Sequence, residues 1–154
     1  MPGSTVTDAE RLEVRRYRAS DRAAVVELWR RCDLTRPWNN PGLDIDRKTT
    51  RDPDGFLVGV IDGAVVTVVM AGYDGHRGWI NYLAVDPDRR GAGLGAEIMR
   101  AAEQHLARLG CPKVNLQIRT SNIDAVRFYE SIGYSMDDVV SMGRRLIDDE
   151  AGPA

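Results

Sequence analysis

Cysteine and histidine are scarce in this sequence, which contains two of each. Cys32 and Cys111 lie far apart, and neither belongs to a Cys-x-x-Cys pair. A disulfide framework or a zinc site needs several such residues at close spacing. The sequence therefore predicts neither, and no metal is expected.

Long hydrophobic runs are also lacking. The longest apolar stretch, AVVTVVMA at residues 64–71, is much shorter than the roughly 20 residues that cross a bilayer. The N-terminal MPGSTVTDAER has no apolar core and is not typical of a signal peptide. With a net charge of −2, the chain has no overall positive charge that would attract nucleic acid or a membrane surface. These absences predict a cytoplasmic protein without nucleic-acid or membrane partners.

The composition is that of one ordinary domain. The chain has 154 residues, of which 43% are hydrophobic and 29% charged, enough for a proper core with a soluble surface. We expect a single domain over residues 11–148, a flexible N-terminus over 1–10 and a flexible tail over 149–154.

The hydrophobic periodicity predicts an alternation of strands and helices. The clearest local signal is Asp62-Gly63, which stands between two β-branched runs and suits a type I′ hairpin turn. Helices are predicted at residues 21–32 (capped by Ser20), 45–51, 93–110 and 121–133, and strands at 12–17, 55–61, 64–73, 78–85, 113–118 and 134–147, the last as one or two closing strands.

A helix normally joins parallel strands, so strands 78–85 and 113–118 should lie parallel in an otherwise antiparallel sheet. The predicted fold class is α/β, with a mixed, mostly antiparallel central sheet, one parallel strand–helix–strand unit and helices on both faces.

Three glycines crowd the start of a helix in PDRRGAGLGA, residues 87–96. A helix N-terminus presents free N–H groups and the positive end of the helix dipole, which suits phosphate. Glycine lets an anion touch these groups, and Arg89 and Arg90 add positive charge. The pattern indicates a diphosphate site, and the plain alternative is a glycine-rich turn into a surface helix.

A dinucleotide-binding site is a rival interpretation, because GAGLGA fits the loose pattern G-x-G-x-x-A. That pattern should directly follow a strand, whereas DPDRR intervenes here. An acidic residue about 20 positions further on should meet the ribose, but that region reads LQIRT. The context therefore disfavours an NAD(P)-dependent oxidoreductase.

RRGAGLGA resembles the R/Q-x-x-G-x-G/A signature of the GCN5-related N-acetyltransferases (GNAT), with Arg90, Gly93 and Gly95 in the defining places. INYLAVDP and SNIDAVRFYESIGY extend the resemblance in order along the chain. LWRRCDLTRPWNNP, DIDRK, AGYDGHRG and GRRLIDDE are similar to the bacterial YpeA-type members. The resemblance implies a GNAT fold and acetyl transfer from acetyl coenzyme A (acetyl-CoA) to an amine by direct attack in a ternary complex. The implied contacts with acetyl-CoA are Leu83, Ala84, Val85, Arg89, Arg90, Gly91, Ala92, Gly93, Leu94, Gly95, Ala96 and Asn122.

Asn122 and Tyr129 are seven residues apart and so lie on one face of the predicted helix. From the residues alone, Asn122 reads as an N-cap and Tyr129 as a core aromatic. The resemblance implies instead that Asn122 contacts the cosubstrate and that Tyr129 is the catalytic acid that protonates the leaving thiolate.

The acceptor amine is not identified by the sequence. We expect the acceptor side to include Asp33, Trp38, Asp74, His76 and Tyr82. Many relatives have a glutamate base on strand 78–85, where this chain has Asn81 and Tyr82. A low-pKa amine, such as a protein or peptide N-terminus or a small amino compound, is therefore the predicted acceptor. A non-catalytic acyl-CoA-binding regulatory module is the alternative function, and a homodimer is one possible assembly.

Overall fold

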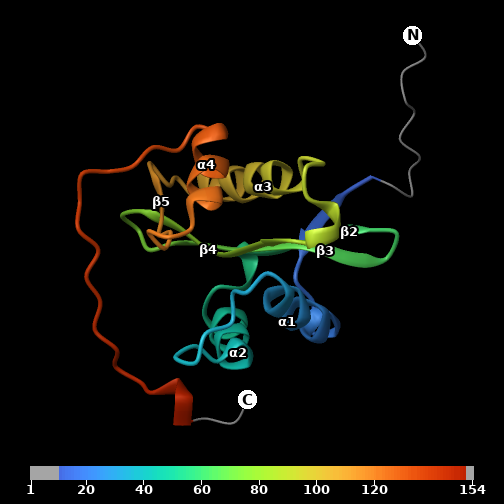
Figure 1. Cartoon of the computed structure of the whole chain (residues 1–154), viewed down its shortest axis with the longest axis horizontal. Coiled ribbons are helices and arrows are strands. Elements are labelled where there is room, and N and C mark those ends of the chain that lie inside the picture. Colours follow the sequence, from blue (N-terminus) through green and yellow to red (C-terminus); the bar gives the residue numbers. More distant parts are fainter. Residues whose placement is uncertain (1–10, 152–154) are drawn as a thin grey trace.

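The computed structural model describes residues 11–151, built around one five-stranded sheet (Figure 1). The strand order is β1-β2-β3-β4-β5. The first three pairings are antiparallel, and β4 pairs with β5 in parallel, which confirms the predicted mixed sheet. The strands are β1 (Glu13–Arg16), β2 (Phe56–Ile61), β3 (Ala64–Tyr73), β4 (Gly78–Val85) and β5 (Val114–Leu116).

Helices cover both faces of the sheet, as the sequence predicts (Figure 1). Helices α1 and α2 lie on one face, and α3 and α4 lie on the other. Their bounds are α1 (Arg22–Arg31), α2 (Pro41–Arg51), α3 (Leu94–Arg108) and α4 (Ile123–Ser131). Short 3-10 turns are η2 (Ala19–Asp21), η3 (Pro53–Gly55), η4 (Pro87–Arg89) and η5 (Asp149–Ala151). Residues 1–10, predicted to be flexible, lie outside the described part of the chain.

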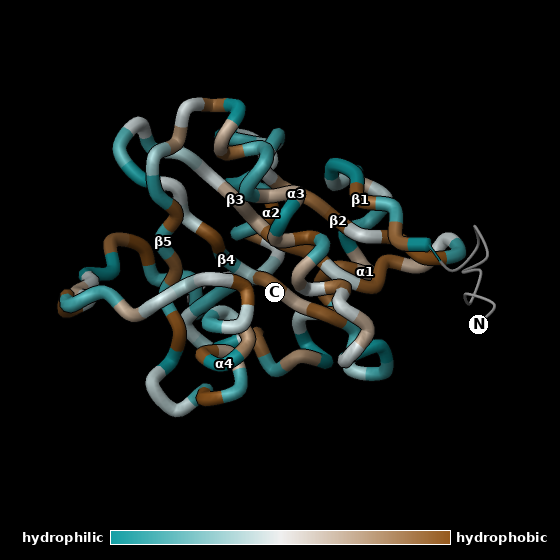
Figure 2. Tube along the Cα trace, turned by 90° about the horizontal axis from the view of Figure 1, so that it is seen from above, coloured by the Kyte–Doolittle hydropathy of each residue, from teal (hydrophilic) through white to brown (hydrophobic). Residues whose placement is uncertain are grey.

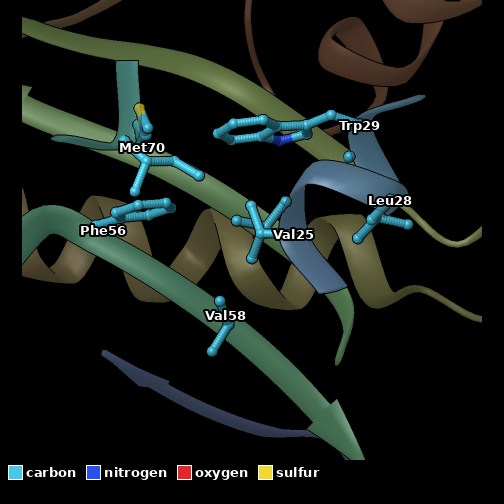
Figure 3. Packing of buried hydrophobic residues seen from close by; sticks show 9 residues of the cluster. Val25, Leu28, Trp29, Phe56, Val58 and Met70 are labelled. Atoms are coloured by element: carbon cyan, nitrogen blue, oxygen red, sulfur yellow. The ribbon is translucent and has the colours of Figure 1, made fainter. Parts of the chain in front are cut away.

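Each face of the sheet has its own hydrophobic core. On the α1 face, Trp29 and Phe56 are fully buried and pack with Val25 (Figure 3). On the α3 face, Ile98 and Leu106 pack against the central strands. Strands β2 and β3 are hydrophobic over long stretches, and the peripheral loops are mostly hydrophilic (Figure 2). Helices therefore cover both faces of β2 and β3, which agrees with the continuous β-branched runs in these two strands.

The β2–β3 hairpin forms as predicted. Asp62 and Gly63 have φ angles of 48° and 77°, and two positive φ angles define the type I′ turn.

The start of α1 differs from the prediction that Ser20 caps it. Ser20 lies inside η2, and the Asp21 carboxylate instead accepts a hydrogen bond from the Arg18 N–H at 2.8 Å. Arg15 of β1 donates to the same carboxylate at 2.8 and 2.9 Å. This carboxylate ties the turn before α1 to the sheet, and Asp21, the N-cap residue of α1, makes no side-chain capping hydrogen bond.

The predicted closing strands over residues 134–147 are wrong, because this segment forms no strand. It runs from α4 around the β5 edge towards α2 (Figure 1). Side chains rather than backbone pairing attach it: Lys113 meets Asp137 at 2.6 Å, and Gln117 donates to Ser141. Strand β5 pairs over only three residues, so the edge it offers to another strand is short.

The C-terminal tail also starts later than predicted. Asp149 is buried and accepts two hydrogen bonds from Arg47 of α2, at 2.7 and 2.8 Å. Residues 149–151 are therefore part of the folded domain, because this bidentate pair fixes the chain.

Replacing Gly55 by alanine should destabilise the fold. A Cβ at Gly55 would lie 1.9 Å from the carbonyl oxygen of Ala71, so η3 could not pack on β3 without backbone movement. We expect a loss of about 1–3 kcal/mol in unfolding free energy, measured by denaturant melts. The control Gly143→Ala, with open space around it, should stay within about 0.5 kcal/mol of wild type. Equal stability of both variants would show that η3 is not held against β3.

Candidate active site

Strand β4 contains a bulge at Tyr82 and Leu83. Met70 of β3 pairs with Asn81 and Val68 pairs with Ala84, so two β4 residues face the single residue Val69. Tyr82 has a φ of 57°, which is uncommon for a bulky residue. A bulge bends its strand and interrupts pairing.

Strands β4 and β5 separate just before this bulge. They pair only from Gly78–Val114 to Ile80–Leu116, so residues 82–85 have no partner strand on the β5 side. The backbone of Leu83, Ala84 and Val85 lies in this separated stretch. The two parallel strands therefore form a wedge.

The conformation at Tyr82 is held from the α1–α2 face. Trp29 donates from its indole N–H to the Tyr82 carbonyl at 3.2 Å, and the two rings stack with centroids 4.0 Å apart. The Tyr82 hydroxyl donates to Asp44 Oδ2 at 2.6 Å. Burial and this carboxylate raise the pKa of Tyr82, so the phenol remains protonated.

Two further β4 carbonyls after the bulge are bonded by side chains. The buried Thr67 hydroxyl donates to the Ala84 carbonyl at 2.7 Å, and the Cys32 thiol donates to the Val85 carbonyl at 3.2 Å. Side chains from β3 and α1 thus stabilise a strand segment that β5 does not pair with.

The N-terminus of α3 is free to bind an anion. Its N-cap is Gly93, with a φ of 80° and no capping side chain, whereas Asn40 and Asn122 cap α2 and α4. The first-turn N–H groups of α3, through Ala96, therefore have no intrahelical acceptor. Such groups and the helix dipole together favour a phosphate.

The charges around this terminus also favour an anion. Arg89 and Arg90 are exposed and form no ion pair within residues 11–151. The nearby Asp86 and Asp88 are paired with Arg31, at 3.1 and 3.2 Å. These two aspartates thus share one arginine, whereas Glu97 in the first turn of α3 is exposed. Arg90 makes one contact of its own, with Cys32 Sγ at 3.8 Å.

Glycine occupies the three positions of this loop for different physical reasons. Gly91 and Gly93 have positive φ angles of 86° and 80°, and nothing lies within 4 Å of a Cβ placed there. Gly95 is buried, and its Cβ would come within 3.0 Å of the Phe128 ring. Close packing of α3 on α4 explains Gly95, and open access for a ligand is consistent with Gly91 and Gly93.

Asn122 is the N-cap of α4, the plainer of its two interpretations. Its Oδ1 accepts a hydrogen bond from the Ala125 N–H at 3.1 Å. The side-chain amide N–H groups have no partner within the described chain and could still donate to a ligand.

Tyr129 is nearly buried, with 9% of its surface exposed. Its ring packs edge-on against Phe128 and Tyr134 at 5.0 and 5.6 Å. Its hydroxyl has no hydrogen-bond partner among residues 11–151, and Tyr129 is one of the residues that line a cavity of about 870 Å³ beside β5. Burial raises the pKa of Tyr129 to about 12, so the phenol holds its proton at neutral pH.

The residues predicted on the acceptor side fall into separate groups. Trp38 lies under the Arg119 guanidinium, 5.0 Å from the ring centroid, and so connects the α1–α2 loop to the chain after β5. Asp74 accepts from the backbone of His76 and Arg77 at 2.8 and 2.7 Å in the β3–β4 turn. The side chain of His76 is exposed.

Asp33 does not join either group. It is exposed, with a φ of 56°, and pairs with Arg36 of its own loop at 3.2 Å. The structure therefore places it as a loop residue directed at solvent.

Sequence reasoning missed the α2 side chains at this site. Asp44 contacts Tyr82, and Lys48 and Asp52 line a smaller cavity against β3 and β4. These three residues are spaced four apart in the sequence, so they lie on one face of the helix. This spacing is the sequence feature that could have predicted them. No cluster of three or more metal-ligating side chains occurs in residues 11–151. No helix in the same range is long and apolar enough to cross a membrane.

Comparison with known proteins shows which protein family this chain resembles. The family model described as the Acetyltransferase (GNAT) family matches residues 22–134. The chain is 46% identical over 138 residues to an acetyltransferase of Pectobacterium atrosepticum, covering 90% of this chain and 98% of that protein. It is 47% identical over 140 residues to one of Sodalis glossinidius, covering 90% and 99%.

Solved structures share the fold. Ard1 from Thermoplasma volcanium superposes with a TM-score of 0.70 at 25% identity, covering 82% of this chain and 84% of that one. AAC(6')-Iy in complex with the bisubstrate analogue CoA-S-monomethyl-acetylneamine gives a TM-score of 0.71 at 14% identity, covering 90% and 100%. The family model and these relatives define an acetyltransferase. This chain belongs to the GNAT acetyltransferase family.

Replacing Gly93 by glutamate should weaken acetyl-CoA binding. A carboxylate at the α3 N-terminus would repel the diphosphate, and losing one charge-assisted contact alone costs about 1.5–3 kcal/mol. We expect the dissociation constant measured by calorimetry to rise at least about tenfold. Gly93→Gln carries the same backbone strain without the charge and should weaken binding less. A folded Gly93→Glu variant with wild-type affinity would rule out this anion site.

Proposed function

We propose that this protein is an acetyl-CoA-dependent N-acetyltransferase that acts on low-pKa amines by direct attack in a ternary complex. The observation that carries this proposal is the uncapped N-terminus of α3, next to the bulged edge of β4, with Arg89 and Arg90 beside it and in no ion pair within residues 11–151. Membership of the GNAT family supports acetyl transfer.

The residues around the wedge fit acetyl-CoA. The N–H groups from Gly91 to Ala96 and the two arginines would hold the diphosphate. The β4 backbone from Leu83 to Val85, which has no partner strand on the β5 side, would bind the amide groups of the pantetheine arm, and Asn122 would donate its side-chain amide. Bound acetyl-CoA supplies an activated thioester.

Tyr129 is proposed as the general acid. When the amine nitrogen bonds to the acetyl carbon, the carbon–sulfur bond breaks and the sulfur needs a proton. The Tyr129 hydroxyl has no competing partner in the described chain, and its raised pKa keeps it protonated. Backbone N–H groups next to the bulge would stabilise the developing oxyanion.

Tyr82 is proposed to orient the acceptor amine. Its hydroxyl hydrogen is directed to Asp44, so the lone pairs of the oxygen remain available to accept from the amine N–H. Asp44 in turn holds the phenol in this orientation. The amine proton then leaves to solvent, directly or through this pair.

Replacing Tyr129 by phenylalanine should lower turnover far more than acetyl-CoA affinity. General acid catalysis contributes about 10²–10⁴-fold, and the aromatic packing is retained. In wild type, the rate should not fall between pH 8 and about 10, because the pKa of Tyr129 is raised to about 12. Wild-type turnover in the variant would show that Tyr129 only packs, and binding without turnover on any amine would support a non-catalytic acyl-CoA-binding module.

Low-pKa amines should be acetylated faster than lysine side chains. Near pH 7.4, a lysine amine with pKa about 10.4 needs about 4 kcal/mol to become neutral, and an α-amine at about 7.7–8.0 needs under about 1 kcal/mol. The β4 position of the family's glutamate base holds Asn81 and Tyr82, which cannot offset the larger cost. The measurement is competition between a peptide with a free N-terminus and blocked lysine and a peptide blocked the other way. Faster acetylation of the lysine peptide would contradict this acceptor class.

A further inference from the structure

A second cavity, of about 260 Å³, lies between the C-terminal half of α2 and strands β3 and β4. Its lining includes Lys48, Asp52, Gly72, Asp74, Trp79 and Asn81. The volume suits one small substituent of a ligand rather than a whole coenzyme.

One end of this cavity lies at the bulge. Asn81 directly precedes Tyr82 and pairs with Met70 across the sheet. The side chain of Asn81 is exposed and makes no hydrogen bond within residues 11–151. A group entering the cavity from the bulge would therefore meet an amide that can both donate and accept.

The floor of the cavity presents hydrogen-bonding capacity that the protein does not use. Lys48 Nζ donates to Asp52 Oδ2 at 2.9 Å and to the Ala71 carbonyl at 2.6 Å, and its side chain is only 14% exposed. An ammonium has three N–H donors, so one remains. Asp52 Oδ1 accepts no hydrogen bond from residues 11–151 and is a free acceptor.

The charges in the cavity are already balanced or bonded. Lys48 and Asp52 neutralise each other, and the Asp74 carboxylate accepts from two backbone N–H groups and from the Trp79 indole at 3.3 Å. A charged substituent would have to compete with this ion pair and give up its hydration. An apolar substituent would cover the free donor and acceptor without bonding them.

Gly72 keeps the cavity open. A Cβ at this position would lie 3.3 Å from Asp52 Oδ2 and 3.4 Å from Lys48 Nζ, so it points at the ion pair. The φ of Gly72 is not in the left-handed region, so a side chain there adds volume without that backbone strain.

We propose that this cavity is the specificity subsite for the acceptor, and that it takes an uncharged hydrogen-bonding group, an amide or hydroxyl, borne by the carbon next to the one that carries the reacting amine. This inference rests on the proposed acetyl transfer. The Lys48–Asp52 pair binds the group, Asn81 guides it from the bulge, and the Trp79 ring forms an apolar wall.

Three amino-acid amides with similar α-amines test the subsite: asparaginamide, leucinamide and glycinamide. Asparagine and leucine side chains have nearly the same shape, and glycinamide has no side chain to place in the cavity. We expect kcat/KM for asparaginamide to exceed that for leucinamide by roughly tenfold, the size of one or two neutral hydrogen bonds.

Gly72→Val fills the cavity and should remove most of this preference through a higher KM for asparaginamide. Glycinamide turnover and the calorimetric affinity for acetyl-CoA should change little. Asp52→Ala removes the free acceptor and should bring the asparaginamide-to-leucinamide ratio towards one. Ala64→Val adds a similar volume at the exposed start of the same strand and should leave the ratio unchanged.

The outcomes separate the subsite from the proposed function. Turnover of all three amides with equal kcat/KM, or a ratio unaffected by both cavity variants, would overturn the subsite alone. A wild-type protein that binds acetyl-CoA but does not acetylate glycinamide or free peptide N-termini would overturn the proposed transfer, and the subsite with it.

Discussion

The packing of Trp29 on Tyr82 is the interaction on which the rest of this site depends. Tyr82 adopts a backbone conformation that a bulky side chain rarely occupies, at a cost of about 1–3 kcal/mol. The stacked indole, its hydrogen bond to the Tyr82 carbonyl and the Asp44 carboxylate together offset that cost. With the bulge held, β4 turns away from β5 and leaves its backbone free to bind a ligand.

Once the strands separate, the protein must satisfy the polar backbone by other means. Side chains of Trp29, Thr67 and Cys32 bond the β4 carbonyls of Tyr82, Ala84 and Val85. The α3 N-terminus is left without such a substitute, which is unusual for buried or half-buried backbone. These β4 carbonyls are thus hydrogen-bonded, whereas the first-turn N–H groups of α3 are not. This difference favours an anionic ligand that accepts hydrogen bonds.

The acidic net charge of the chain conceals this local arrangement. Arg31 forms ion pairs with both Asp86 and Asp88, and so offsets part of the negative charge beside the α3 terminus. On the opposite face of the sheet, Lys48 and Asp52 cancel each other inside a small cavity. The two proposed ligand-binding regions thus differ in character: two arginines flank one, and a lysine–aspartate ion pair lies in the other.

Local sequence determined the elements whose cause lies within a few residues. Asp62-Gly63 specified its turn through two positive φ angles. Gly110 directly follows the helical periodicity in the sequence, and its φ of 86° is consistent with the end of α3 at this point. The parallel unit followed from chain order, because a helix cannot connect antiparallel neighbours as a tight hairpin does.

Only the tertiary structure decided the features that depend on distant partners. The bulge at Tyr82 needs Trp29 and Asp44, and nothing in WINYLAV itself favours a positive φ at a tyrosine. The lack of a side chain at Gly95 is explained by Phe128 of another helix, which the local sequence does not reveal. The segment at 134–147 had strand-like residues, but strand formation also requires an edge to pair with, and three-residue β5 provides little. Patterns of propensity describe a residue and its neighbours, whereas these outcomes were set by contacts between elements far apart in the chain.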